Sequence, residues 1–434
     1  MSFDGLREAV RGQVLLAGDE GFAQASTPWN VTVAQPVAAV VTAADADDVA
    51  ALIAYARRAG LSVAAQSTGH GASGDVDGVI LLRTGLLNQV EVDVDRRVAR
   101  MGAGAKAGQV QAAAAAHGLT ALPGSSPVVG VAGYLLGGGL SWFSRKHGWA
   151  SDAVRAFEIV DADGRQARVT AESDPELFWG LRGGGGDVAV VTAIECELFP
   201  AAGLYGGRVL WPGERTREVF AAFQELTASA PAELSVWLHR IQPPGGAPLV
   251  GLDAAYLGDP EAGKALLAVL DSLGGTIADT RGVVPLADFG GICAEPTDPT
   301  PALTRGALLT DLGDAVAELL IDGPIAPLVS LQIRHLGGAL TEPVATPGAR
   351  GPVAEPFLVN LLGIGLPHLA DAVLARQREL LDALSGHTGP TPYTFLAAGD
   401  RAASAFDDPT VARLRALKQA RDPHGTFRAS FPLH

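Results

Sequence analysis

Two hydrophobic periods, one typical of strands and one of helices, alternate along the first 200 residues. A β-branched run at 37–42 predicts a short strand, and Asp45 then opens a helix with apolar positions 49, 52, 53 and 56 on one face. Gly60 stands where such a helix ends, and 61–65 returns as a strand. Further strands are expected at 79–82, 90–94, 98–101, 157–161, 166–170 and 188–199, and further helices at 106–117 and 175–181.

From about residue 200 the pattern changes to strands joined by short loops, with the helices kept apart. Such an order is typical of an antiparallel sheet covered by helices on one face. We therefore expect an α+β protein of two domains, 1–199 and 200–399, with a tail, 400–434, that returns to the first. The expected strands are 234–241, 249–256, 329–334 and 356–362, and the expected helices are 214–228, 261–273, 368–384 and 410–419.

Composition and charge limit the classes of function. The chain has 434 residues, of which 48% are hydrophobic, and a net charge of −15, with no run of basic residues. A nucleic-acid-binding surface is not expected, because neutralising phosphates needs clustered cations. No apolar stretch is long enough for a membrane span or a signal peptide, and two cysteines cannot form a disulfide framework. These features favour a cytoplasmic protein.

Glycine concentrates in runs between the expected elements, at 69–78, 102–108, 130–139 and 183–186. Such runs leave main-chain N–H groups open to phosphates. Gly102, Gly104 and Gly108 lie between a strand and a helix, but no acidic residue ends a strand about 20 residues later, which disfavours a dinucleotide fingerprint. The segment 125–139 is more informative, because its small residues suit a long main-chain cradle for an extended diphosphate ligand.

His70 lies in the Ser/Thr/Gly loop 66–74. A histidine in such a loop is, taken alone, more often a surface or turn residue than a functional one. No second histidine or carboxylate lies at metal-ligand spacing and no G-x-S-x-G elbow is present, so neither a metal site nor a serine hydrolase is expected. The glycine-bearing segments occur together and in order, however, which favours a functional role for His70.

Six segments together carry a specific pattern. They are 66–73 (QSTGHGAS), 126–142 (SPVVGVAGYLLGGGLSW), 146–152 (KHGWASD), 174–200 (DPELFWGLRGGGGDVAVVTAIECELFP), 333–340 (IRHLGGAL) and 417–433 (LKQARDPHGTFRASFPL). This pattern resembles the flavin-dependent oxidoreductases with a vanillyl-alcohol-oxidase-type FAD domain, also called the p-cresol-methylhydroxylase (PCMH) type, and within them the berberine-bridge-enzyme-like group. The resemblance covers nearly the whole chain and is strongest in its first 200 residues.

The resemblance implies a PCMH-type FAD domain beside an antiparallel substrate-binding sheet, with the active site between them. His70 matches the family histidine that is bonded to the flavin 8α-methyl, so covalent FAD is expected. An imidazole attached there withdraws electron density and raises the flavin potential. The residues expected to bind the cofactor are Ser67, Thr68, Gly69, His70, Gly71, Ala72, Ser73, Ser126, Val129, Gly130, Gly133, Gly138, Gly139, Leu140 and Val191.

Several positions depart from the family pattern. Bicovalent members have a cysteine in place of Ser126, and serine cannot form that thioether, so the resemblance implies a single covalent bond. Val129 matches the family position beside flavin C4a, and a valine there resembles the family members that react with oxygen. Family members often have a phenol side chain directly after the triple glycine, and this chain has Leu140 there. The asparagine and phenylalanine that usually follow the four-glycine run are replaced by Asp187 and Val188. Some of the residues that accept the substrate proton in the family are therefore absent here or lie at other positions.

Candidates for the substrate side lie in the second half of the chain. The resemblance makes Tyr393 the first choice for a catalytic proton acceptor and His239 the second, and Arg334 or His335 is expected to lower the pKa of Tyr393. Period-two spacing places Tyr393 on one strand face with Phe395, as it does 237 with 239. Which of these faces meets the flavin stays open. The remaining candidates are Trp237, Gln332 and Asn360.

These inferences favour an FAD-dependent oxidase that takes hydride from a C–H next to oxygen or nitrogen and reduces dioxygen to hydrogen peroxide. The expected partners are dioxygen and a small natural-product, sugar or amine substrate, with no nucleic acid and no membrane. A flavin dehydrogenase with another acceptor and a non-redox flavoprotein cyclase remain alternatives. Cys293 is expected to be a small buried hydrophobe rather than a nucleophile.

Overall fold

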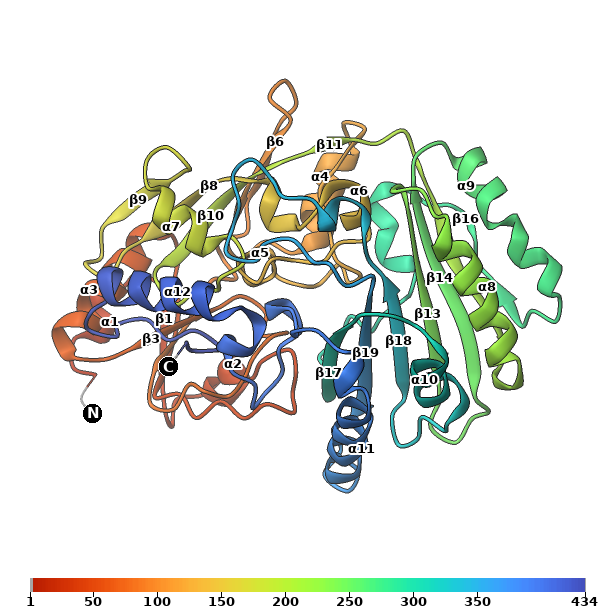
Figure 1. Cartoon of the computed structure of the whole chain (residues 1–434). Helices are drawn as coiled ribbons and strands as arrows, with labels where there is room; N and C mark the ends of the chain where they lie inside the picture. Colours follow the sequence, from red (N-terminus) through yellow and green to blue (C-terminus); the bar gives the residue numbers. More distant parts are fainter. Residues whose placement is uncertain (1–2, 434) are drawn as a thin grey trace.

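The computed structural model describes residues 3–433, and within them the strands form sheets of four, five and eight strands and one two-stranded ribbon. Figure 1 shows two halves side by side. One half holds the first 200 residues and the C-terminal tail, and the other holds the eight-stranded sheet with its helices. None of the described helices is long and apolar enough to cross a membrane.

The first sheet follows the interleaved pattern of strands and helices. It contains β1 (Gln13–Leu16), β2 (Ala39–Thr42), β3 (Val63–Gln66) and β4 (Ile80–Arg83), in the order β1-β2-β4-β3. Helix α3 (Ala46–Ala59) begins and ends as predicted: the Asp45 carboxylate accepts from Asp48 N–H, and Gly60 closes the helix with a φ of 66°. Its apolar face packs on this sheet, which fixes the end of β3 immediately before the His70 loop.

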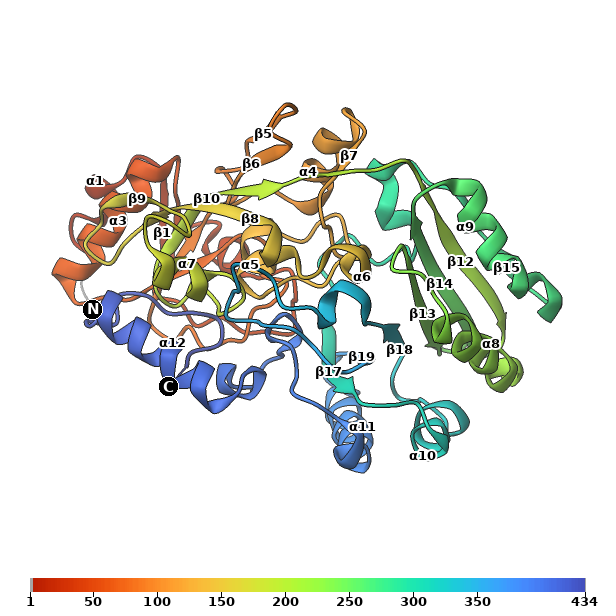
Figure 2. The same ribbon diagram turned by 45° about the horizontal axis from the view of Figure 1, so that its top comes forward.

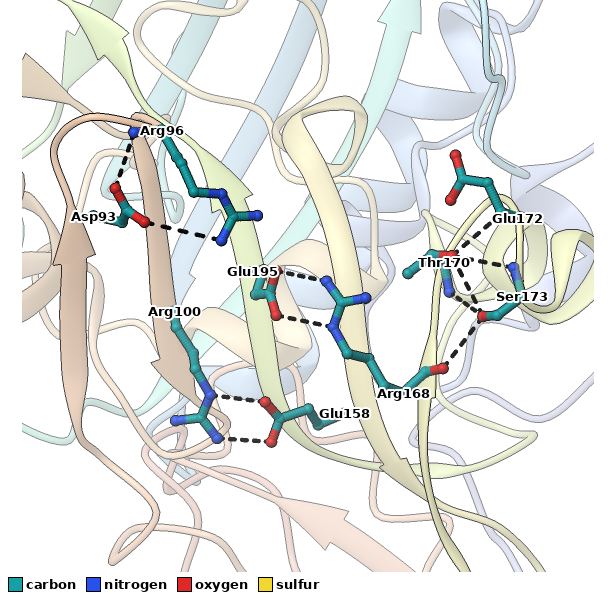
Figure 3. A network of polar contacts seen from close by, with 9 residues as sticks. All are labelled: Asp93, Arg96, Arg100, Glu158, Arg168, Thr170, Glu172, Ser173 and Glu195. Atoms are coloured by element: carbon teal, nitrogen blue, oxygen red, sulfur yellow. Dashed lines mark hydrogen bonds and ion pairs between the residues drawn. The ribbon is translucent and has the colours of Figure 1, made fainter.

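The second sheet is antiparallel, in the order β5-β6-β10-β8-β9: β5 (Val90–Asp93), β6 (Val98–Gly102), β8 (Val154–Val160), β9 (Gln166–Val169) and β10 (Val190–Glu197). The predicted hairpin around 162–164 is present as β8 and β9. Figure 3 shows cross-strand ion pairs on this sheet, in which Arg100 bonds Glu158 and Arg168 bonds Glu195. These partly exposed pairs help to set the strand register and contribute roughly 0.2–1 kcal/mol each.

Short helices and a ribbon complete the first half. They are α1 (Leu6–Ala9), α2 (Phe22–Ser26), α4 (Ala107–Ala115), α5 (Val131–Leu136), α6 (Ser144–His147), α7 (Pro175–Leu181), β7 (Leu119–Thr120) and β11 (Phe199–Pro200). The predicted long strand at 188–199 is therefore divided between β10 and β11.

The third sheet is antiparallel throughout, as expected. Its strands are β12 (Leu204–Pro212), β13 (Leu234–Ile241), β14 (Leu249–Leu257), β15 (Ala278–Asp279), β16 (Gly282–Val283), β17 (Ala302–Leu309), β18 (Ser330–His335) and β19 (Phe357–Ile364). They follow the order β15-β12-β14-β13-β18-β19-β17, with β16 also paired to β12. The sequence pattern did not predict β12 or β17, because glycines interrupt both and few β-branched residues mark them.

Helices cover one face of this sheet, on the side away from the first half (Figures 1 and 2). They are α8 (Thr216–Ala228), α9 (Pro260–Leu267), α10 (Asp314–Ala317) and α11 (Ala370–Ala383). Apolar residues of these helices and of alternate strand positions form one core, for example Phe223, Leu331 and Ile333. Because side chains alternate across a strand, residues such as 332 and 334 point to the opposite face, towards the first half.

The tail packs on the first half, as Figure 1 shows in blue against red. Helix α12 (Asp408–Arg421) places the buried Lys418 ammonium 2.6 Å from the main-chain oxygen of Asp187 and 2.8 Å from the Asp422 carboxylate. After α12 the chain runs beside β3, where Val63 N–H donates to Thr426 O at 2.7 Å. The exact domain limits stay a prediction.

Arg145 of α6 joins the two halves. Its buried guanidinium donates to the main-chain oxygens of Leu234 at 2.8 Å and Ala230 at 3.0 Å, and also to that of Leu336. The start of β13 with the loop before it, and the loop after β18, are thereby held by one side chain of the first half. The face of the third sheet is fixed over the glycine segments of the first half.

Candidate active site

The loop after β3 holds the His70 ring in one orientation. The ring stacks on Trp29 with 4.0 Å between centroids, and Nδ1 lies 2.7 Å from Thr68 Oγ1. Nε2 is buried and has no hydrogen-bond partner among residues 3–433. Burial and, to a lesser extent, the charge of Lys106 lower the pKa of His70 to about 4, so the ring is neutral at physiological pH. Nε2 is therefore the ring nitrogen left for another group.

The other residues of this loop divide between solvent and the tail. Gly69 has a φ of 83°, where glycine is favoured, and Gly71 is exposed with nothing near its Cβ position. Ala72 is buried, and the Ser73 hydroxyl donates to the main-chain oxygen of Ser430. Ser73 thus holds the loop to the tail, and its predicted cofactor contact stays a prediction.

The segment 125–139 lies beside this loop, but its middle, Val131–Leu136, is helix α5 and not part of an extended main-chain cradle as predicted. A Cβ at Gly130 would lie 2.6 Å from Ser67 Oγ, so the two segments approach as closely as glycine allows. The Oγ atoms of Ser67 and Ser126 are buried without a hydrogen-bond partner among the described residues. Gly133 is exposed, with open space where its Cβ would be. The arrangement suits a flat ligand that brings its own hydrogen-bonding atoms.

The larger apolar residues predicted to bind the cofactor, Val129, Leu140 and Val191, have different surroundings. Val129 is half-buried at the start of the cradle. Leu140 is buried against Leu308 and Leu358 of the third sheet, so it lies at the boundary between the halves. Val191 packs in the core of the first half, and its cofactor contact stays a prediction.

The face of the third sheet that meets the first half carries a row of aromatic and polar side chains. Trp237 stacks on Trp142 of the first half, with 3.6 Å between ring centroids. The Arg334 guanidinium lies 3.9 Å above the Trp237 ring and donates to Gln332 Oε1 at 2.7 Å. These residues occupy neighbouring strands in register, since Trp237 pairs with Arg334 and Gln332 with Asn360. The sequence left the orientation of this face open, and the structure turns it towards the predicted flavin site.

A buried polar chain crosses the same face. Arg208 donates to both carboxylate oxygens of Asp253, at 2.5 and 2.8 Å, and lies 3.0 Å from His239 Nδ1. His239 Nε2 in turn lies 2.6 Å from Ser330 Oγ. Burial by itself would raise the pKa of Asp253, but hydrogen bonds from Arg208 and His239 outweigh burial and hold it below its ordinary value. The carboxylate is therefore charged and fixes the imidazole between itself and Ser330.

Sequence reasoning missed Arg208, Asp253 and Ser330, and it also missed Glu295. Glu295 accepts from Ser125 Oγ at 2.9 Å and lies 3.9 Å from Arg334, so it connects the cradle to the sheet. A signal for Asp253 existed, since it is a single charge inside an otherwise apolar strand. Nothing comparable marked Glu295, which lies in a loop.

Two expectations for Tyr393 are wrong. The residue lies in a 3-10 turn (Tyr393–Phe395), not on a strand face shared with Phe395. Its hydroxyl points to the four-glycine run, because a Cβ at Gly185 would lie 2.6 Å from it. Burial and the charge of Asp187 raise the pKa of Tyr393 well above its ordinary value, so neither Arg334 nor His335 lowers it. Tyr393 stays a protonated phenol, which is a poor proton acceptor.

Comparison with known proteins identifies the first half. The family model described as "FAD binding domain" matches residues 37–170. The (R)-6-hydroxynicotine oxidase of Paenarthrobacter nicotinovorans is 28% identical over 464 residues, which cover 98% of this chain and 96% of that protein. The chain is an FAD-dependent oxidoreductase that is similar to the vanillyl-alcohol-oxidase type.

Two solved structures share the fold of this FAD-linked oxidoreductase. The BBE-like 1 protein of Physcomitrella patens has a TM-score of 0.86 at 18% identity and full coverage of both chains, 100% each. The xylooligosaccharide oxidase of Myceliophthora thermophila C1 has a TM-score of 0.85 at 20% identity and covers 98% of each chain. The two-domain PCMH-type α+β architecture implied by the sequence is confirmed.

The observed residues of this FAD-linked oxidoreductase fit the cofactor. His70 Nε2, Ser67 Oγ and Ser126 Oγ are buried without a hydrogen-bond partner among the described residues, and these are groups that a bound cofactor could satisfy. Asp187, which replaces the usual family asparagine, is held by Lys418 of the tail, with 3.2 Å between Oδ1 and Nζ. The tail therefore contacts the residue that directly follows the four-glycine run 183–186. Cys293 is 2% exposed, and burial raises the pKa of its thiol well above the ordinary value, so it is buried and protonated as expected.

Proposed function

We propose that this FAD-linked oxidoreductase is an oxidase that removes a hydride from a C–H next to nitrogen or oxygen of a small substrate. The row of aromatic and polar side chains that faces the cradle carries this proposal, because it offers both a stacking surface and fixed charges to a bound molecule. The name of the P. nicotinovorans relative, an oxidase of a nitrogen heterocycle, supports it. A natural product, sugar or amine is the substrate class.

His70 holds the cofactor by a single covalent bond in this proposal. Its Nδ1 is occupied by Thr68, so Nε2 is the nitrogen that bonds the flavin 8α-methyl. The Ser126 hydroxyl replaces the thiol that bicovalent relatives use, and it remains a hydrogen-bonding group. When bound, FAD would accept the hydride at N5 and pass two electrons to dioxygen, which leaves as hydrogen peroxide.

The buried polar chain of the third sheet, which includes Asp253, His239 and Ser330, accepts the substrate proton in this proposal. An alcohol must lose its hydroxyl proton as the hydride leaves, and Leu140 offers no phenol for this. His239 is the acceptor in this proposal: Ser330 Oγ lies 2.6 Å from Nε2 and can relay a proton to it in the tautomer whose Nδ1–H faces Asp253 at 3.5 Å. An amine that binds as the neutral base needs no acceptor, and the chain would then only orient it.

Arg334 and Trp237 position the substrate in this scheme. The guanidinium is buried on the sheet face between Trp237 and Phe395, at 3.9 and 5.3 Å from their ring centroids. Among the described residues its Nη1 has no hydrogen-bond acceptor. A carbonyl, hydroxyl or ring nitrogen of the substrate is the group that Nη1 would bind.

Two further parts of the proposal concern oxygen and location. Val129 is a small side chain at the position that matches the family site beside flavin C4a. Family members with such a residue react with oxygen, which favours dioxygen over another electron acceptor. Both cysteines, Cys196 and Cys293, are free and buried, which agrees with a reducing compartment and a cytoplasmic location.

The experiment that tests the function is a substrate panel on the purified protein. Amines, N-heterocycles, sugars and aromatic alcohols are added without oxygen, and bleaching of the flavin absorbance is followed. Admission of air should restore the colour and release one hydrogen peroxide per substrate oxidised. Bleaching that only an added dye reverses would support a dehydrogenase instead. Turnover to an isomer without any bleaching would support a non-redox cyclase.

A further inference from the structure

Arg350 is a buried cation without a counter-ion. It lies in the connection between β18 and β19, which crosses from the third sheet to the first half (Figures 1 and 2). Residue 350 is 9% exposed, and its Nε is buried without a hydrogen-bond partner among residues 3–433. No carboxylate of these residues lies within 4.0 Å of the guanidinium.

The position of Arg350 is fixed by contacts on both sides. Ala349 N–H donates to Trp179 O at 3.1 Å, and Arg182 donates to the main-chain oxygen of Thr346, so this connection is held to α7. The Arg350 guanidinium carbon lies 4.7 Å from the centroid of the Trp149 ring. The side chain therefore has a defined place.

That place is where two glycine runs meet. A Cβ at Gly183 would lie 2.6 Å from Arg350 Cβ, and a Cβ at Gly138 would lie 3.3 Å from Arg350 Cγ. Gly138 belongs to the predicted cofactor cradle, and Gly183 begins the four-glycine run. Both runs approach the arginine stem as closely as a glycine permits.

Two more donors nearby also lack acceptors. Trp149 Nε1 and Ser151 Oγ are buried without a hydrogen-bond partner in the described part of the chain. Both residues follow the triple glycine closely, and Ser151 N–H donates to Gly138 O at 2.9 Å. Buried polar groups in native proteins are almost always paired. The unpaired Arg350 Nε, with the unpaired Trp149 Nε1 of the ring beside its guanidinium, indicates that an acceptor belongs here.

The charge of Arg350 persists in spite of its burial. Burial lowers its pKa to about 10, and the more distant Glu355 opposes this shift only in part, so the guanidinium is protonated at neutral pH. An unpaired charge in the protein interior is costly, and ordinary packing does not explain why an arginine is kept here.

We propose that Arg350 is the counter-charge for an anionic oxygen of bound FAD, placed where Gly138 and Gly183 meet. Two parts of FAD offer this chemistry: the diphosphate, and the N1–C2=O edge of the isoalloxazine, which becomes negative on reduction. The inference depends on FAD binding alone and not on the proposed oxidase reaction. Loss of the oxidase reaction would leave it intact.

The test compares Arg350→Met, which removes the charge and keeps the stem, with Arg350→Lys, which keeps the charge. The matched control is Arg376→Met, a half-buried arginine of α11 on the far side of the third sheet. Each is made in a His70→Ala background, so that FAD exchanges reversibly whether or not the wild type is covalently linked. Affinities for FAD, ADP and riboflavin and the thermal midpoint of the apoprotein are measured. The flavin midpoint potential is measured in the otherwise wild-type holoenzyme.

Arg350→Met is expected to weaken FAD binding by roughly 10- to 100-fold, the usual worth of a charge-assisted hydrogen bond. A parallel loss of ADP affinity assigns the oxygen to the diphosphate. An unchanged ADP affinity together with a flavin midpoint potential about 30 mV lower assigns the oxygen to the isoalloxazine. For a two-electron couple, about 30 mV corresponds to tenfold weaker binding of the reduced flavin relative to the oxidised flavin. Arg350→Lys keeps the charge, so its loss of affinity or potential should be smaller than that of Arg350→Met. The Arg350→Met apoprotein should be at least as stable as its parent.

Two results would overturn the inference. One is a less stable Arg350→Met apoprotein with unchanged FAD affinity and potential, which would make Arg350 a packing residue. The other is a change confined to the KM of acidic substrates, which would assign the oxygen to the substrate. If the methionine variant does not fold, the potential and affinities of Arg350→Lys decide between the same outcomes.

Discussion

Asp253→Asn is the change that best tests the buried polar chain on the sheet. Asparagine keeps the size of the side chain but removes the charge that faces Arg208. The carboxylate is fully buried and the Arg208 side chain is only 18% exposed, so solvent screens this pair weakly. Breaking a fully buried pair by removing one partner costs about 3–5 kcal/mol. Partial exposure of Arg208 and the oxygen that asparagine retains reduce the expected loss to about 2–3 kcal/mol.

The assay is thermal unfolding of wild type and variant. For a chain of this length such a loss lowers the midpoint by about 2–3 °C if the protein unfolds as one unit, and by about twice that if the second half unfolds alone. Glu195→Gln is the matched control, because it breaks the more exposed pair with Arg168 on the outer sheet (Figure 3) and should cost at most about 1 kcal/mol.

The pH dependence gives a second readout. The folded pKa of Asp253 is lowered, so the stability it contributes is present above the ordinary pKa of an aspartate and is lost as the pH falls through the folded pKa. The gap between wild type and Asp253→Asn should therefore be constant from pH 5 to 8 and close in stronger acid. A gap no larger than that of Glu195→Gln, or one that widens towards low pH, would refute the reasoning.

Three further predictions concern the reaction. A peptide that carries FAD on His70 and none on Ser126 is expected by mass spectrometry, and full release of flavin by acid precipitation would contradict the tether. Val129→Leu should slow reoxidation of the reduced enzyme in stopped flow while substrate reduction changes little, and an unaffected reoxidation rate would remove this residue from oxygen access. Tyr393→Phe should change the flavin reduction rate by less than about tenfold, since a protonated phenol is no base, whereas His239→Gln should lower it roughly 10²–10⁴-fold for an alcohol and little for an amine. A large loss in Tyr393→Phe, with a shifted pH profile, would restore the phenol to the mechanism.

The sequence predicted the parts of this protein that depend on neighbouring residues. Helix α3 begins at Asp45 and ends at Gly60 because a cap and a left-handed glycine act within a few residues. Strand β13 occupies the predicted 234–241, since its apolar run is bounded by clear turn residues. The His70 loop and the segment 125–139 were proposed as cofactor-binding from short segments that carry a family pattern, and their cofactor contacts stay predictions.

Tertiary structure decided the rest. Strands β12 and β17 contain glycines and form because they pair with neighbours distant in the sequence, so local propensity could not reveal them. The face of the third sheet that meets the first half depends on where the helices pack, and a single alternation leaves two faces equally possible.

The same reason separates the site residues that were found from those that were missed. His70 became a candidate through a family pattern of several segments along the chain, and its bond to the flavin stays a prediction. Asp253 becomes part of a site only when Arg208 and His239 from two neighbouring strands reach it, and Arg350 only when its connection crosses to the glycine runs of the other half. Tyr393 lies against Gly185, and its predicted role as a base is disfavoured because burial and Asp187, rather than a cation, set its pKa. Local sequence determines which chemical groups a segment offers, whereas the charge state and partners of a group depend on what long-range packing brings beside it.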